Sequence, residues 1–318
     1  MMQARSGRVD KALVAAAGCI VALVVAGGLY DRNFLSPAYL LQQLQVAAFL
    51  GVVATGVMLV VVLGHIDLSI PWVVTIGGMM ATAAAGRGGW ASGLAIPVAV
   101  ACGVGIGIGN GFGVAYLRVP SMIFTLATNA IAQGVMVIHT GGFAPEDRAT
   151  PAMHFVAVER SVLGIPNAVV VWAVLGAAVV GVLRRTSFGR RIYAIGNSER
   201  AVYLSRGNVR HVVVACFAIA GGCSAFAGVL LAGYASKAYQ AMGDPYLLPA
   251  IAAVVLGGTP ILGGRGSYLG TIAGVILVTL LQSMLSIVQM SEAGRQVIYG
   301  AVIILMLLVY GRGAKVVT

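Results

Sequence analysis

Apolar stretches long enough to cross a lipid bilayer recur along the whole chain. A transmembrane helix needs about 20 predominantly apolar residues. Ten segments approach or meet this length: 12–30, 45–63, 68–86, 93–116, 119–139, 166–183, 211–233, 246–263, 267–290 and 296–310. Of the 318 residues, 59% are hydrophobic and 9% are charged, so the chain is far more apolar than a soluble domain. The sequence predicts an all-α, polytopic membrane bundle of about ten spans and excludes a soluble enzyme or DNA-binding domain.

Basic residues fall unevenly on the two sides that ten spans define. The termini, the loop around Arg118, the loop 184–210 and the loop around Arg265 share one side and hold most of the 20 Lys and Arg residues. The termini contribute Arg5, Arg8, Lys11, Arg312 and Lys315. Because cytoplasmic loops carry the excess of Lys and Arg, we expect both termini to be cytoplasmic. This topology explains the net charge of +11 without a nucleic-acid partner.

The segment 12–30 follows basic residues and resembles a secretory signal in that respect. Its apolar stretch is long for a signal peptide, so we expect a retained span. No linker divides the chain, and we therefore expect one transmembrane domain over 1–318, with 184–210 as a cytoplasmic loop within it. The cysteines lie in apolar runs without ligand spacing, so we expect no disulfide and no metal site.

Enzyme motifs are absent from the sequence. A Walker A loop has a Lys directly after a Gly, and none of Lys11, Lys237 and Lys315 follows a glycine. The sequence also lacks the His-Glu-x-x-His and Gly-x-Ser-x-Gly patterns. We therefore expect no catalytic residues and no cofactor bound by this chain.

One apolar run is interrupted at residues 63–71, which read Leu-Gly-His-Ile-Asp-Leu-Ser-Ile-Pro. Broken helices at membrane depth occur along substrate pathways of transporters, because the freed backbone groups need a partner or water. In this interpretation His65, Asp67 and Ser69 line the pathway, and Asp67 is also a candidate for a proton relay. A cytoplasmic turn that only joins two spans explains the same residues equally well.

A second interruption lies within 254–260, where Gly257, Gly258 and Thr259 follow apolar residues and precede a proline. Its sequence is similar to that of the first interruption, with Gly257 aligned to Gly64, which suggests an internal repeat. Two interrupted segments in corresponding halves of a transporter indicate the substrate path. We therefore add these two glycines and Thr259 to the candidate pathway residues.

Small and polar residues form stripes within two of the predicted spans. Thr125, Asn129 and Gln133 are four residues apart and share one helix face. Such a stripe either lines a pathway or bonds to a neighbouring helix. We favour a pathway, and its neutral groups suit a sugar or polyol better than an ion. The segment 93–116 carries two glycine stripes that predict close helix packing: Gly103, Gly107 and Gly111, and Gly105, Gly109 and Gly113.

Four stretches carry a more specific signal. They are Ile-Asp-Leu-Ser at 66–69, Val-Pro-Ser-Met-Ile-Phe-Thr-Leu-Ala at 119–127, Gly-Arg-Arg-Ile-Tyr-Ala-Ile-Gly-Asn at 189–197 and Ala-Ile-Ala-Ala-Val-Val-Leu-Gly-Gly-Thr at 250–259. Together, and in this order, they resemble the permease subunits of ABC sugar importers of the ribose/xylose type. The chain departs from the usual family pattern at His65, Pro71, Arg206 and Pro249.

The resemblance implies a set of partners in the bacterial inner membrane. These are a second permease chain, a periplasmic substrate-binding protein and a cytoplasmic ATPase subunit that binds the ATP. It also implies a coupling helix in the loop 184–210 that contacts the ATPase. The implied coupling residues are Gly196, Asn197, Glu199, Arg200, Ala201, Leu204 and Ser205.

The function implied is import of a monosaccharide or related polyol. One alternative is a permease for another small solute, such as a nucleoside or a branched-chain amino acid. Another is a secondary transporter driven by an ion gradient, which predicts transport without ATP and its loss on Asp67→Asn.

Overall fold

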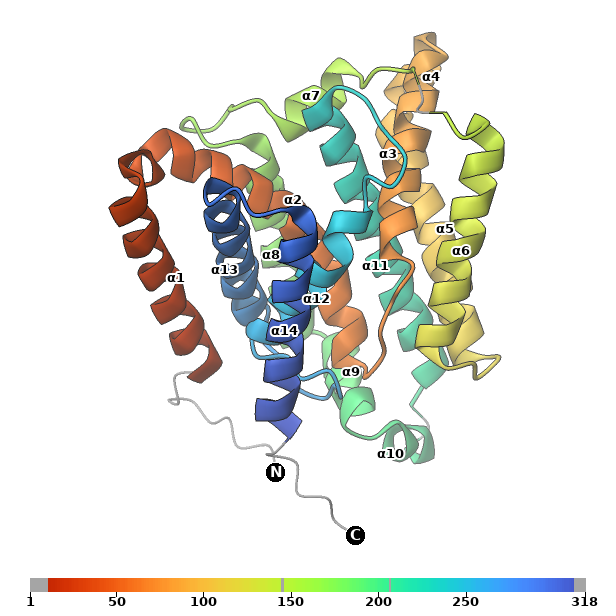
Figure 1. Cartoon of the computed structure of the whole chain (residues 1–318). Coiled ribbons are helices and arrows are strands. Elements are labelled where there is room, and N and C mark those ends of the chain that lie inside the picture. The colour runs from red at the N-terminus through yellow and green to blue at the C-terminus, as the bar shows by residue number, and fades with distance from the viewer. Residues whose placement is uncertain (1–10, 144–145, 206, 312–318) are drawn as a thin grey trace.

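The computed structural model describes residues 11–143, 146–205 and 207–311. Arg5, Arg8, Arg206, Arg312 and Lys315 lie outside these residues. Within them, the ten predicted apolar segments correspond to ten helices of one bundle (Figure 1). These are α1 (Lys11–Tyr30), α2 (Pro37–Val62), α3 (Ile70–Gly86), α5 (Ala95–Ala115), α6 (Ser121–Thr140), α8 (Asn167–Arg185), α11 (Val209–Ala235), α12 (Leu247–Leu256), α13 (Tyr268–Ile287) and α14 (Glu292–Gly311).

Short helices lie at the two ends of the bundle (Figure 1). At one end are η1 (Arg32–Leu35), α4 (Gly89–Gly93) and α7 (Pro151–Ala157), and at the other are α9 (Ser187–Asn197) and α10 (Glu199–Leu204). The 3-10 helix η2 (Asp244–Tyr246) leads directly into α12.

Not every predicted segment forms a helix long enough to cross a membrane. In the part of the chain that the structure describes, seven helices are long and apolar enough to cross a membrane: α1, α2, α5, α6, α8, α11 and α13. Helix α3 has 17 residues and α12 has 10. The prediction of one continuous span over 246–263 is therefore wrong, whereas the prediction of a polytopic helical bundle is confirmed.

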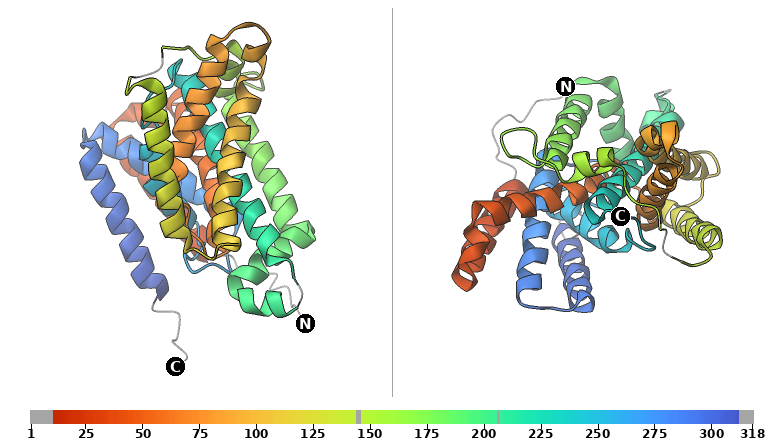
Figure 2. Two further views of the ribbon diagram at one scale, coloured as in Figure 1. Left: turned by 90° about the vertical axis from the view of Figure 1, so that its right-hand side faces the viewer. Right: turned by 90° about the horizontal axis from the view of Figure 1, so that it is seen from above.

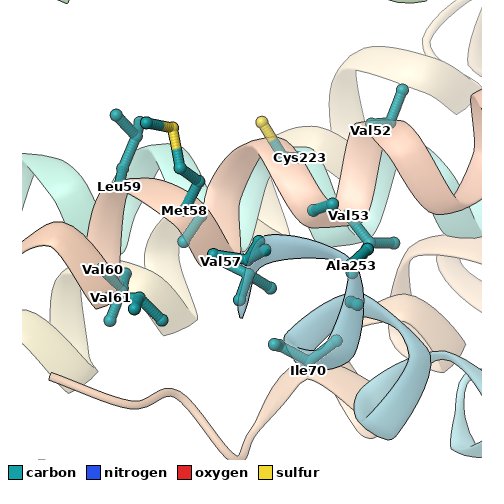
Figure 3. Close-up of a cluster of buried hydrophobic side chains, with 14 of the residues drawn as sticks. Val52, Val53, Val57, Met58, Leu59, Val60, Val61, Ile70, Cys223 and Ala253 are labelled. Atoms are coloured by element: carbon teal, nitrogen blue, oxygen red, sulfur yellow. The ribbon is translucent and has the colours of Figure 1, made fainter. Parts of the chain in front are cut away.

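The centre of the bundle is formed by α2 and α11, which pack against each other and against most other long helices (Figure 2). From Ala47 to Val62 every residue of α2 is buried, so this part of the helix is covered on all sides. Figure 3 shows valines and Met58 of α2 beside Cys223 of α11 and Ala253 of α12. Lipid tails are as apolar as these side chains, so close van der Waals packing between helices holds α2 at the centre.

One glycine stripe of α5 provides close packing against α11, as the sequence predicts. A Cβ atom on Gly107 would lie 2.2 Å from the Phe217 carbonyl oxygen, and one on Gly103 would lie 2.4 Å from the Gly221 carbonyl oxygen. In the second stripe, a Cβ on Gly109 would meet no atom within 4 Å. The two stripes therefore have different surroundings, and only the first brings two backbones together.

The described basic residues agree with the predicted topology. Helix α1 begins, and α14 ends, at the end of the bundle where α9 and α10 lie (Figure 1). The basic loop 184–210 forms α9 and α10, and Arg118 is paired there with Glu199. By the positive-inside rule this end is cytoplasmic. Helices α4 and α7 then lie on the opposite side.

Both interruptions end their helices with the same hydrogen-bonded turn. At the end of α2, Gly64 has φ +84°, and the His65 N–H donates to the Val60 carbonyl at 3.1 Å. At the end of α12, Gly258 has φ +90°, and the Thr259 N–H donates to the Val254 carbonyl at 3.2 Å. This is the Schellman arrangement, in which a left-handed glycine ends the helix.

Gly64 therefore corresponds to Gly258 in the structure. The sequence alignment that paired Gly64 with Gly257 is wrong by one residue. The similarity of the two interruptions itself is confirmed at the level of backbone geometry, because both glycines adopt a conformation that residues with a Cβ rarely adopt.

Candidate substrate pathway and coupling site

The first interruption is an extended segment between α2 and α3. Helix α2 ends near α9, and the chain then turns back so that α3 begins well inside the bundle (Figure 1). Residues 65–69 have no regular secondary structure, and the backbone N–H groups after His65 lack helical acceptors. Pro71 lies in the first turn of α3, where a missing N–H costs no hydrogen bond.

Side chains of α6 supply acceptors for this segment. Ser121 Oγ accepts from the Ile66 N–H at 3.2 Å, and Thr125 Oγ1 accepts from the Leu68 N–H at 2.9 Å. One turn further, Asn129 Oδ1 accepts from the Trp72 N–H at 3.3 Å. Thr125 and Asn129 of the stripe on α6 thus bond to a neighbouring segment, whereas Gln133 makes none of these bonds, and a pathway role for the stripe stays a prediction. The stripe satisfies backbone donors that would otherwise be buried without partners.

Asp67 belongs to a buried hydrogen-bond network. Its Oδ1 accepts from the Ser69 N–H at 2.9 Å and from Ser69 Oγ at 2.6 Å. Ser69 Oγ in turn accepts from Asn110 Nδ2 at 2.8 Å, and Thr128 Oγ1 donates to Asn110 Oδ1 at 2.7 Å. The carboxylate thus fixes the start of α3 and, through Asn110, connects it to α5 and α6. A proton relay at Asp67 stays a prediction.

The second interruption contacts the first directly. The Gly264 N–H donates to the Val62 carbonyl at 2.8 Å. A Cβ on Gly263 would lie 2.6 Å from the Gly64 nitrogen. Gly263 and Gly264 have φ +80° and +77°. Segments almost two hundred residues apart in the sequence therefore meet backbone to backbone, and only glycines permit this approach.

Helix α9 holds this junction from the cytoplasmic side. Asn197 Nδ2 donates to the Gly264 carbonyl at 2.9 Å, and the Tyr193 hydroxyl donates to the Gly266 carbonyl at 3.0 Å. Burial raises the pKa of Tyr193, so its hydroxyl stays protonated as this bond requires. A Cβ on Gly196 would lie 1.9 Å from the Val62 carbonyl oxygen. Both interruptions therefore touch the same helix end.

The predicted coupling residues lie on α9 and α10 or beside them. Ser198 caps α10 by accepting from the Ala201 N–H, and Ser205 Oγ donates to the Ala201 carbonyl at the other end. Glu199 Oε1 accepts from Arg118 Nη1 at 2.7 Å, which ties α10 to the loop between α5 and α6. Arg200 and Leu204 are exposed. A short helix, α10, thus forms where the resemblance implies a coupling helix, and its apolar Leu204 is exposed.

The remaining predicted pathway residues are not all brought together. The His65 ring lies 6.1 Å from the buried Phe217 ring, measured between centroids. Gln133 is exposed and lies further along α6 than the residues that contact the first interruption. Thr259 is fully buried beneath Gly266. A pathway role for these residues stays a prediction.

Four residues of this site were missed in the sequence: Ser121, Asn110, Thr128 and Tyr193. Ser121 precedes Thr125 by one helical turn, so extending the stripe backward would have found it. Asn110 stands out as a polar residue in a glycine-rich span. Nothing local distinguishes Tyr193, because its acceptor, Gly266, is distant in the sequence.

Comparison with known proteins identifies the family. Residues 39–307 match the family described as branched-chain amino acid transport system, permease component. The chain belongs to this family of permeases. The matched residues contain both interruptions, α9 and α10, so the permease family covers the whole site.

Ribose import permeases are among the relatives of this permease. That of Bacillus subtilis is 35% identical over 291 residues, covering 90% of this chain and 88% of the relative. That of Haemophilus influenzae is 30% identical, covering 91% and 90%. An inner membrane ABC transporter permease of Escherichia coli, YjfF, is 29% identical, covering 75% and 73%. No solved structure matches the chain. The permease is therefore a multi-pass protein of the bacterial inner membrane and a transport component.

Proposed function

We propose that this permease is the membrane-spanning subunit of an ATP-driven importer for a monosaccharide or related polyol. The observation that carries the proposal is the identity of 35% with a ribose import permease over 90% of the chain. The family description names branched-chain amino acids. The individual relatives named for ribose and the neutral polar groups around the first interruption favour a sugar over these or a nucleoside.

ATP is bound and hydrolysed by a separate ATPase subunit that docks on α10. Tyr203 and Leu204 are 62% and 73% exposed there, beside the charged Glu199 and Arg200. An apolar pair with a charged rim is typical of a protein interface. A second permease chain and a periplasmic substrate-binding protein complete the importer.

The contacts of α9 suggest how ATP hydrolysis reaches the pathway. Movement of α10 and α9 displaces Gly196 and Asn197, which touch the end of α2 and the segment 257–267. Residues 65–69 and 257–267 lie outside regular helices, so these segments change shape at lower cost than a continuous helix. The interruptions then serve as the gates that alternate between outward and inward openings.

Co-purification tests this proposal. The tagged chain is isolated in mild detergent from native membranes, and the proteins that accompany it are identified by mass spectrometry. We expect a stoichiometric Walker A ATPase that is lost on Glu199→Lys or Arg200→Glu. Lys237→Glu, which reverses an exposed charge at the opposite end of the bundle, is the control and should retain the ATPase.

Two further results decide among the alternatives. A thermal-shift series on the co-purified binding protein, with sugars, nucleosides and amino acids, identifies the class of solute. A chain that purifies alone and still moves solute into vesicles without ATP contradicts the proposal and supports an ion-driven transporter.

A further inference from the structure

A polar cavity of about 510 Å³ lies between α2, α13 and α14, away from α9 and α10. Its volume is within the range of roughly 300–1,000 Å³ that is usual for sites of small molecules. The side chains around it come from the first half of α2, the segment 239–246 that includes η2, the last turns of α13 and the beginning of α14. By the topology derived above, these turns face the periplasmic side.

The polar groups of this cavity are mostly uncharged. Gln43 and Gln282 contribute amides, Ser286 contributes a hydroxyl, and Tyr39 and Tyr239 contribute rings. Amides and hydroxyls both donate and accept, as sugar hydroxyl groups do. None of the described residues that line the cavity is acidic, which argues against a cation as the ligand.

Among the described lining residues, Arg295 carries a charge and contributes a bond that shapes the site. Arg295 Nη1 donates to Ser286 Oγ at 2.9 Å, which joins the start of α14 to the end of α13. The Tyr39 and Ser283 hydroxyls are hydrogen-bonded across the cavity floor between α2 and α13. The site is therefore held in shape by side chains from all three helices.

Thr279 gives an independent indication of a ligand. It lines the cavity and is 2% exposed, yet its Oγ1 has no hydrogen-bond partner among the described residues. A buried hydroxyl without a partner costs about 1–3 kcal/mol. A ligand hydroxyl in the cavity would remove this cost.

The cavity adjoins a smaller hollow of about 250 Å³, with which it shares Pro245 and Tyr299. This hollow extends to Pro71 in the first turn of α3 and to Gln296 of α14. The cavity and this hollow are therefore neighbours, and the hollow reaches the start of α3, which follows the first interruption.

We propose that this cavity is a binding site for a monosaccharide or polyol within the permease itself, occupied before the substrate reaches the interruptions. The inference rests on the proposed function for the class of ligand. It adds that this subunit contributes its own binding groups, with Thr279 and Gln282 among them.

Direct binding tests the assignment. The full chain is reconstituted into nanodiscs, and the binding of radiolabelled D-ribose, D-xylose and ribitol is measured at equilibrium. We expect saturable binding of at least one probe. Thr279→Val and Gln282→Leu should each weaken it by about 3- to 10-fold, as expected for the loss of one hydrogen bond.

Thr271→Val is the matched control. Thr271 lies on the same helix, is 1% exposed and also has an Oγ1 without a partner among the described residues, but it does not line the cavity. Its replacement should leave binding unchanged. No saturable binding of any probe, or unchanged affinity in both cavity variants, overturns the assignment.

Uptake of the same probes by the complete importer separates this inference from the proposed function. If both cavity variants take up the probes at the wild-type rate, the cavity assignment is overturned and the proposal of sugar import is unaffected. Binding that depends on Thr279 and Gln282, without any ATP-driven uptake by the wild type, supports the cavity and contradicts sugar import.

Discussion

At the scale of the residue, Asp67 acts as a hydrogen-bond acceptor for Ser69. An asparagine at this position keeps the Oδ1 acceptor and loses the charge. We therefore expect Asp67→Asn to retain ATP-driven uptake within about threefold of the wild type. Asp67→Ala leaves buried donors without an acceptor and should lower the free energy of unfolding by about 1–3 kcal/mol. Uptake into vesicles and thermal unfolding of the purified variants check both expectations.

The same pair of variants also tests the ion-driven alternative. If Asp67→Asn folds normally but abolishes transport, the negative charge or a proton on this carboxyl is essential. That outcome would favour a proton relay over the positioning role that the hydrogen bonds indicate.

At the scale of the element, the packing of α5 against α11 depends on one glycine face. A side chain on Gly107 would collide with the Phe217 carbonyl oxygen at 2.2 Å. Gly107→Ala should therefore lower the thermal unfolding midpoint, at a cost of about 1–3 kcal/mol typical of overpacking. Gly109→Ala, on a face where no atom lies within 4 Å, is the control and should be neutral or gain up to about 1 kcal/mol in helix propensity.

If the two variants have equal thermal unfolding midpoints, the close contact of Gly107 with α11 does not contribute to stability as expected. Both variants replace a glycine of α5 with alanine, so they share the residue type, the helix and the size of the change. It therefore isolates the contact between α5 and α11 from any general effect of glycine on a membrane helix.

At the scale of the whole molecule, α9 connects the docking end to both interruptions. Asn197→Ala removes the bond to the Gly264 carbonyl, and Tyr193→Phe removes the bond to the Gly266 carbonyl. Neither bond involves α10, where the ATPase docks in our proposal. We therefore expect the double variant to retain the co-purified ATPase but to lower the uptake rate by about tenfold or more. Co-purification and uptake, measured on the same membranes, check this separation.

Glu199→Lys is the comparison for that variant, because it should lose the ATPase and uptake together. If the double variant instead transports at the wild-type rate, the bonds of α9 to the second interruption do not transmit the movement. Loss of the ATPase in the double variant would place Tyr193 and Asn197 in the docking surface.

The sequence by itself determined the class of fold, the positions of the helices and the two interruptions. Apolar runs of about 20 residues predict membrane helices, because backbone groups in lipid must bond within their own segment. The left-handed glycines that end α2 and α12 act locally, so Gly64 and the glycines near 257 stood out in the sequence. Two of the four stretches that carry the family resemblance, 66–69 and 250–259, overlap these interruptions.

Only the tertiary structure decided which groups meet. The side chain of Thr125 on α6 accepts a hydrogen bond from the backbone of the extended segment before α3. The carbonyl groups to which Asn197 and Tyr193 donate lie on a loop that is distant in the sequence. The cavity joins Tyr39 to Arg295, from opposite ends of the chain. Helix formation depends on neighbours in the sequence. Which faces of two helices contact each other depends on packing between segments that are far apart in the sequence. No local pattern therefore encodes these contacts.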